Sequence, residues 1–343
     1  MFANRNVIQS DPGPIIGPLA RFFGAILDFL FEFAYMITPT EVHTLGISII
    51  LLTFVVIIIT FPLTHKSQKS MQAMQKLAPE MDKIKKKYEN RKSQEDQKKM
   101  SQEMNKLYSE NGANPLMGCL PMFIQMPVFF SVFHIMRQPY RYVSRLGDVY
   151  TRLAETIIAG FNMDGAGVVQ NYEGLQALIN LAYRYSIIPD NMAFSFIDPD
   201  QLRRMLALLD PYQWDYFMNS ISAESAAQIQ PYLTSKMNLE HFIGIDLVEN
   251  VGFAFPVILI PIACVAFTFL TSYMTQKNQA KPTDPQQKMQ QTMMLVVMPA
   301  MMGVITFGMP AGVGLYWATS SALRIIQQHF TSKLTKPKTE VKP

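Results

Sequence analysis

Four long charge-free windows constrain the fold of this chain more than any other feature of its sequence. They cover residues 44–64, 111–136, 250–276 and 289–323. A helix rises about 1.5 Å per residue, so about twenty residues cross the ~30 Å hydrocarbon core of a bilayer. The last window is 35 residues long, and Gly308-Met309-Pro310-Ala311-Gly312 at its middle predicts a tight hairpin between two spans. We therefore predict an all-α membrane protein with five transmembrane helices, because helices satisfy their own backbone polar groups in lipid.

The distribution of charge predicts the orientation of these spans. Segment 65–114 holds twelve Lys and Arg against seven Asp and Glu, and the C-terminal segment 324–343 holds five against one. By contrast, 138–249 holds seven basic and thirteen acidic residues. Because basic residues near span ends stay in the cytoplasm, we expect 65–114, 277–288 and the C-terminus inside. Five spans then place 138–249 and the N-terminus outside.

The predicted segments alternate between spans and connections. In chain order they are an extracytoplasmic N-terminus (1–43), a first span (44–64), a cytoplasmic helical hairpin (65–114), a second span (115–137), an extracytoplasmic helical insertion (138–249), a third span (250–276), a cytoplasmic loop (277–288), a fourth span (289–308), a fifth span (310–330) and a basic cytoplasmic tail (331–343). Apolar residues in the hairpin recur in steps of three and four, which predicts two amphipathic helices broken near 89–91. Inside the insertion, helices are expected near 149–160, 172–186, 200–209 and 221–236.

Residues 15–38 admit two interpretations. Arg21, Asp28 and Glu32 are spaced seven and four apart, so they share one face of a helix. That pattern favours a helix lying in the membrane interface with its apolar side in lipid. The length of the segment also allows a sixth span. The polar stretch before it has no basic segment leading into an apolar one, so it is not expected to be a cleavable signal.

The sequence carries no constellation typical of catalysis, metal binding or nucleotide binding. The five histidines lack metal-ligand spacing, and no HExxH pair or GxxxxGK[ST] loop occurs. No acidic residue lies in a predicted span, which disfavours intramembrane aspartate proteases and proton-coupled transporters. Cys119 and Cys264 fall inside spans and are expected to be small apolar fillers. We therefore predict a protein that is not an enzyme and that needs no cofactor.

The predicted spans do carry hydroxyl and amide side chains. They are Thr53 and Thr60 in the first span, Gln125, Ser131 and His134 in the second, Thr268, Thr271 and Ser272 in the third, and Thr319, Ser320 and Ser321 in the fifth. Taken singly, each is typical of a hydrogen bond between helices. Together they could line a polar groove.

Four motifs resemble the YidC/Oxa family of membrane-protein insertases. They are FPLTHKSQKSM (61–71), NPLMGCLPMFIQMPVFFSVF (114–133), DPQQKMQQTMMLVVMPAMM (284–302) and MPAGVGLYWATSSALRIIQQ (309–328). The resemblance implies a five-helix core in the bacterial plasma membrane, with an interfacial N-terminal helix and a polar groove open to cytoplasm and lipid. It also implies insertion of nascent membrane proteins, alone or with the Sec translocon, and contact with the ribosome. No counterpart of the large periplasmic sandwich domain of Gram-negative members is found, so the architecture is expected to be closer to the Gram-positive one.

The chain departs from the family pattern at one position. Bacterial members usually carry a groove arginine six residues before the leucine of the Pro-Leu that ends the first span, and this position is Ile57 here. Arg324 follows Pro310 by 14 residues, about 21 Å along a helix, and Ile57 lies about 20 Å into its own span. Our hypothesis is that Arg324 supplies the groove cation. The alternative is an arginine whose long side chain reaches the inner membrane surface.

Tyr316 and Trp317 align with an aromatic pair that lines the substrate exit in the family. Plain aromatic packing between helices is the alternative. The predicted substrate-contact residues are thus Thr53, Ile57, Thr60, Gln125, Tyr316, Trp317, Ser320 and Arg324. Two other functions fit the same spans: a small-solute or ion channel or transporter, and an assembly scaffold without insertion activity. The sequence does not specify the client proteins, the oligomeric state or the task of 138–249.

Overall fold

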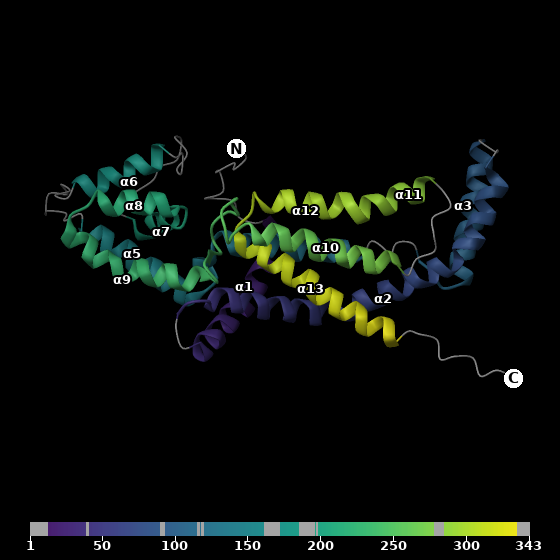
Figure 1. The fold of residues 1–343 in the computed structure, drawn as a ribbon, viewed down its shortest axis with the longest axis horizontal. Helices are drawn as coiled ribbons and strands as arrows, with labels where there is room; N and C mark the ends of the chain where they lie inside the picture. Colours follow the sequence, from purple (N-terminus) through teal and green to yellow (C-terminus); the bar gives the residue numbers. More distant parts are fainter. Residues whose placement is uncertain are drawn as a thin grey trace. The chain divides into compact units, whose positions relative to one another are not determined.

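The computed structural model describes residues 13–334, apart from 39–40, 90–92, 115–116, 118–119, 161–171, 185–195, 197 and 278–284. Its described residues form helices almost throughout (Figure 1). The chain divides into two compact units. The first contains Met1–Leu52, Phe130–Ile260 and Ile305–Tyr316, and the second contains Thr53–Phe129, Pro261–Val304 and Trp317–Pro343.

Three described helices are long and apolar enough to cross a membrane. They are α1 (Gly13–Ile37), the first part of α2 (Thr44–Tyr88) and α10 (Leu259–Lys277). Shorter apolar stretches occur at Phe123–Arg137 in α4 (Leu120–Arg137) and at Met293–Thr306. The helical, membrane-spanning character predicted from the charge-free windows is confirmed, whereas the count of five spans stays a prediction. Cys264 in α10 is a buried free thiol, and Cys119 lies outside the described residues.

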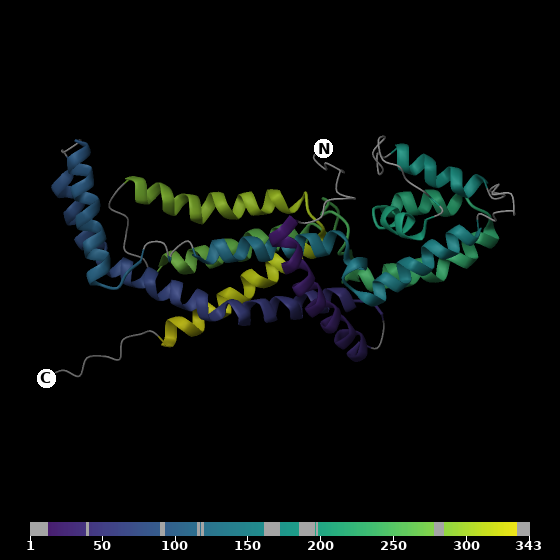
Figure 2. The same cartoon turned by 180° about the vertical axis from the view of Figure 1, so that it is seen from behind.

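Helix α2 runs without interruption from Thr44 to Tyr88 and contains both Pro62 and Pro79, so it includes the predicted first span and the first helix of the predicted hairpin (Figure 2). A proline inside a helix removes one hydrogen bond, but the neighbouring residues can still form theirs. The apolar part of α2 thus continues directly into the Lys-rich part as one helix.

The second helix of the basic hairpin, α3 (Gln94–Glu110), begins after a short connection to α2. Ser93 caps it, since its hydroxyl accepts a hydrogen bond from the backbone N–H of Asp96. Glu103 on α3 holds the end of α2 by accepting from Lys87 at 2.6 Å and from Tyr88 at 2.9 Å.

The helix that contains the predicted 289–308 span begins before Met289. Helix α11 (Pro285–Thr292) already begins inside the predicted loop and continues through a π-helical turn (Met293–Val297) into α12 (Met298–Thr306). The polar run before Met289 has good helix formers, so the helix extends beyond its apolar part. A turn then leads into α13 (Ala311–Leu334).

The insertion after α4 is helical, as predicted, but its helix count and one strand pair were not foreseen. It contains a short 3₁₀ turn (Pro139–Arg141), α5 (Ser144–Gly160), α6 (Tyr172–Arg184), α7 (Pro199–Leu206), α8 (Pro211–Asn219) and α9 (Ala223–Glu240). Helix α8 was not among the expected helices; it begins at Pro211, and Asp210 and Gln213 form a capping box at its start. A small antiparallel pair, β1 (His241–Phe242) with β2 (Ile245–Asp246), corrects the strictly all-α prediction. Its two-residue turn at Ile243 and Gly244 has positive φ at both positions.

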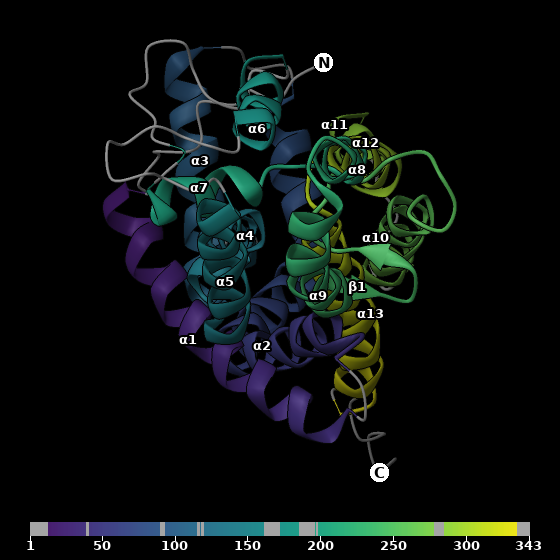
Figure 3. The ribbon, with the colours of Figure 1, turned by 90° about the vertical axis from the view of Figure 1, so that its left-hand side faces the viewer.

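A buried ionic network joins α5 to α9, which lie side by side (Figures 1 and 3). Lys236 and Glu240, one helical turn apart on α9, form an ion pair at 2.7 Å, and their side chains are 7% and 0% exposed. The Tyr150 hydroxyl on α5 donates to the other oxygen of Glu240 at 2.8 Å. Burial raises the pKa of Tyr150 well above its usual range, so this hydroxyl stays a donor at every physiological pH.

The polar face of α1 contacts the start of α5. Asp28 accepts from the backbone N–H and the hydroxyl of Ser144, both at 2.8 Å, at the N-terminus of α5. Glu32 receives two hydrogen bonds from Arg145, at 3.1 and 2.8 Å. Two of the three charged residues on the predicted polar stripe thus bind protein, while Arg21 is exposed.

A short extended segment after β2 holds the turn between α12 and α13. The backbone of Ala311 donates to the Glu249 carbonyl and that of Gly312 to the Leu247 carbonyl, both at 2.7 Å. A Cβ on Gly312 would lie 2.9 Å from the Met136 sulfur and 3.0 Å from the Leu247 carbonyl oxygen, so the close approach requires glycine.

Candidate functional site

The second unit brings Arg324 and Gln125 together. The Arg324 guanidinium on α13 donates to the side-chain oxygen of Gln125 on α4 at 2.5 Å, and both side chains are half-buried. These two residues were singled out separately in the sequence, 199 positions apart. A charged hydrogen bond between two otherwise apolar helices is the strongest polar contact that the predicted set contains.

Trp317 on α13 makes both a polar and an aromatic contact. Its indole N–H donates to the Thr268 hydroxyl on α10 at 3.2 Å. Its ring packs edge-on against Phe129 of α4, with ring centroids 5.3 Å apart. The Ser320 hydroxyl, almost fully buried, is bonded to the Trp317 carbonyl at 3.0 Å. Trp317 therefore lies where α4, α10 and α13 meet, and neither Thr268 nor Phe129 was in the predicted set.

Thr64 is a further residue that the prediction missed. The Gln327 amide on α13 donates to its hydroxyl at 3.5 Å.

Three other predicted residues are in the second unit without forming one cluster. The Thr60 hydroxyl is bonded to its own helix, to the Val56 carbonyl at 2.8 Å. Thr53 is fully buried, and Ile57 is half-buried beside the exposed Ile58 and Ile59.

Tyr316 differs from its neighbour Trp317. It is fully buried and belongs to the first unit, at the start of α13. Its burial fits the alternative of aromatic packing better than a surface that a substrate slides along.

No pattern of the described residues suggests a metal centre, since no group of three or more His, Cys, Asp or Glu side chains could hold an ion there. The polar contacts between α2, α4, α10 and α13 instead consist of one cation, amides, hydroxyls and an indole. Such groups can bind water and polar peptide segments, but they offer no nucleophile paired with a base.

Known proteins match this chain over most of its length. The family model of the 60Kd inner membrane protein matches residues 37–339. A membrane protein insertase YidC of Fusobacterium nucleatum is 28% identical over 302 residues, which cover 88% of this chain and 93% of that protein. Insertases named YidC from Aquifex aeolicus and Geobacter sp. are 48% identical over 109 residues and 40% identical over 117. These matches cover 31% and 34% of this chain and only 20% and 19% of the two relatives. The chain therefore belongs to the 60Kd inner membrane protein family, which is the YidC/Oxa family that its four motifs resemble.

Proposed function

We propose that this protein inserts nascent membrane proteins into the bacterial inner membrane through a polar groove bounded by α2, α4, α10 and α13. The proposed insertion involves no covalent chemistry and no bound nucleotide. The observation that carries the proposal is the bond between Arg324 and Gln125, because it places a cation among helices that are otherwise apolar.

The physical task is to move a polar segment past hydrocarbon. An unpaired peptide group costs several kcal/mol in an apolar medium, on the order of 2–7. A groove that holds water partway across the membrane shortens the apolar part of the path. Transfer of the substrate's own apolar helix into lipid then supplies the driving force. Arg324 would attract an acidic N-terminal tail into the groove, and Gln125 would hold the guanidinium in place.

The proposed topology has five spans, with the N-terminus outside and the C-terminus inside. α1 would lie in the outer interface rather than span. Its Asp28 and Glu32 bind the start of α5 in the predicted extracytoplasmic insertion, while Phe22, Phe29 and Phe33 are exposed. A carboxylate pair bound to an extracytoplasmic helix supports an interfacial position, since a span would carry it into hydrocarbon.

The basic hairpin of α2 and α3 is the proposed contact for the ribosome or the Sec translocon. Lys83, Lys85 and Lys86 precede the connection to α3 and give its tip a positive charge. Anionic RNA or lipid headgroups are the partners that such a surface favours.

Reconstitution tests the function directly. The full-length protein is placed in liposomes without Sec components, and a short single-span substrate with an acidic N-tail is synthesised in their presence. We expect the N-tail to become protected from external protease only in liposomes that contain the protein. Ion flux through the same liposomes without substrate should equal that of empty liposomes. Absence of protection would contradict the insertase proposal, and flux above background would favour a channel.

A further inference from the structure

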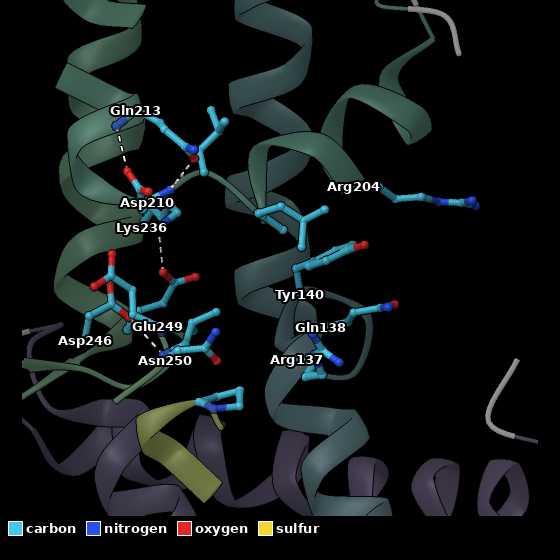
Figure 4. A pocket seen from close by; sticks show the side chains of 16 residues that line it. Arg137, Gln138, Tyr140, Arg204, Asp210, Gln213, Lys236, Asp246, Glu249 and Asn250 are labelled. Carbon is cyan, nitrogen blue, oxygen red and sulfur yellow. Dashed lines mark hydrogen bonds and ion pairs between the residues drawn. The ribbon is translucent and has the colours of Figure 1, made fainter. Parts of the chain in front are cut away.

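A cavity of about 340 Å³ lies at the base of the insertion, within the first unit. Figure 4 shows Arg137 and Tyr140 on one side of it and Asp246 and Glu249 on the other. The side chain of Arg204, which also lines the cavity, points away from the two carboxylates. Its volume falls within the range of roughly 300–1,000 Å³ that is usual for small-molecule sites.

The charges of the cavity do not all cancel within the protein. Lys236 and Glu240 neutralise each other in their buried ion pair. Asp246 uses one carboxylate oxygen to accept from the backbone N–H groups of Val248 and Glu249, at 2.9 and 3.3 Å, which leaves its other oxygen for a ligand. The cavity thus has the cation of Arg137 on one side and an acidic wall from two carboxylates on the other.

The side of the cavity formed by Asp246 and Glu249 carries more negative than positive charge. The pKa of Glu249 is raised to about 7, first by burial and then by Asp246. The charged groups that face it are Asp246 on β2, Lys236 and Glu240 on α9, and Asp210 before α8. Of these, only Lys236 favours the ionised form. A cationic ligand group beside Glu249 would relieve this imbalance.

The place of the cavity narrows the choice of ligand. Arg137 is the last residue of α4, and Pro310 immediately precedes α13. The backbone of Glu249 holds the first residue of α13. In the proposed topology these helices begin or end at the outer membrane surface, so the cavity opens at the level of lipid headgroups.

We propose that this cavity binds a phosphate–ammonium zwitterion, as carried by the headgroup of an aminophospholipid. Arg137 binds the phosphate, for which the planar guanidinium is well suited. Glu249 and Asp246 accept hydrogen bonds from the primary ammonium. A quaternary ammonium cannot donate these bonds, so choline headgroups bind more weakly. The lipid source rests on the proposed topology, but the zwitterion site does not depend on insertion activity.

Soluble headgroups test the chemistry of the site. Glycerophosphoethanolamine, glycerophosphocholine and glycerol phosphate are titrated by calorimetry against the full-length protein in detergent at pH 8. We expect glycerophosphoethanolamine to bind about tenfold more tightly than either of the others. Equal affinity for the ethanolamine and choline compounds, or no binding of any of the three, would overturn the proposal.

Two variants with matched controls locate the binding. Glu249→Gln should remove the preference for ethanolamine over choline, whereas Glu224→Gln, an exposed carboxylate on α9 outside the cavity, should leave it intact. Arg137→Gln should weaken all three phosphates about tenfold, whereas Arg152→Gln on the exposed face of α5 should not. An unchanged preference in folded Glu249→Gln would refute the assignment. Circular dichroism of each variant establishes that it is folded.

Lipid retention then distinguishes the two sources of the zwitterion. The protein is purified from nanodiscs that contain equal amounts of phosphatidylethanolamine, phosphatidylcholine and phosphatidylglycerol, and bound lipid is identified by native mass spectrometry. If the protein retains phosphatidylethanolamine selectively and Glu249→Gln does not, the ligand is a lipid headgroup. Binding of glycerophosphoethanolamine without lipid retention supports the site but assigns it to a soluble zwitterion.

Discussion

Individual residues in this protein have roles that depend on how their charge is compensated. Lys236 and Glu240 are removed from water but neutralise each other, with Tyr150 completing the bonds of the carboxylate. Glu249 lacks such a partner of opposite charge at close range and is held instead beside Asp246. Arg324 donates to the neutral amide of Gln125, which orients the guanidinium.

Breaking the buried ion pair should destabilise the joint between α5 and α9. In Lys236→Met, Glu240 remains buried without its cation, and we expect a loss of about 3–5 kcal/mol in the stability of this domain. Hydrogen exchange of peptides from α5 and α9 measures it. The double variant Lys236→Met/Glu240→Leu should recover most of the protection, since no buried charge is left. Equal protection in the wild type and in Lys236→Met would contradict this account.

The stability of the same domain should depend on pH through Glu249. Its pKa is 4.5 when unfolded and about 7 when folded, so the folded state binds the extra proton between these values. Stability therefore falls as pH rises from about 4.5 to 7, and the full cost remains above pH 7. Allowing for solvent screening, Glu249→Gln should stabilise the domain by roughly 1–2 kcal/mol at pH 8 and not at pH 4. Denaturation monitored at both pH values checks this sign, and a larger gain at pH 4 would contradict it.

At the scale of elements, apolar periodicity predicted the helices well and their ends poorly. The windows located α2, α4, α10, α12 and α13, because burial of apolar surface dominates helix placement in membranes. Pro62 lies inside α2 and Pro211 is the first residue of α8, because a proline's effect depends on its position within a helix. The β1–β2 turn has no pattern in the sequence beyond a single glycine at Gly244. Ile243 adopts positive φ there although it is β-branched, which local propensity does not predict.

The sequence singled out several residues of the candidate site but not the contacts between them. Gln125 was identified as a polar residue inside an apolar window, whereas Trp317 and Arg324 were identified from the family resemblance and from the departure at Ile57. Their partners required the alignment of helices in space. Thr64 bonds to Gln327 across 263 positions, and Thr268 bonds to Trp317 across 49. Burial of Tyr316 likewise follows from the packing of α13, which a lone sequence does not contain.

Attachment of α1 should depend on its two carboxylates. In Asp28→Asn/Glu32→Gln the charged bonds to Ser144 and Arg145 are lost, and we expect α1 to exchange amide hydrogens about tenfold faster. Arg21→Gln, which removes the exposed charge of the same stripe, serves as the control and should not change exchange. No difference between the two variants would contradict a role of α1's polar face in binding α5.

At the scale of the whole molecule, the chain combines membrane helices with a helical insertion and a basic hairpin. The family match extends over residues 37–339, so it includes the insertion as well as the spans. The proposed work of insertion belongs to the second unit, where Arg324 lies. The proposed zwitterion site belongs to the first. The two proposals can therefore fail separately, since one is measured by insertion and the other by headgroup binding.

The most direct test of the central claim is insertion of the acidic-tailed substrate by Arg324 variants in liposomes. We expect Arg324→Ala to lower the insertion rate roughly tenfold, equivalent to ~1.4 kcal/mol, and Arg324→Lys to retain part of it. Adding Ile57→Arg to Arg324→Ala should restore insertion, because it returns a cation to the groove from α2. Lys277→Ala, which removes an exposed charge at the end of α10, should have no effect. Full insertion by Arg324→Ala, at equal protein content, would contradict the claim that Arg324 is the groove cation.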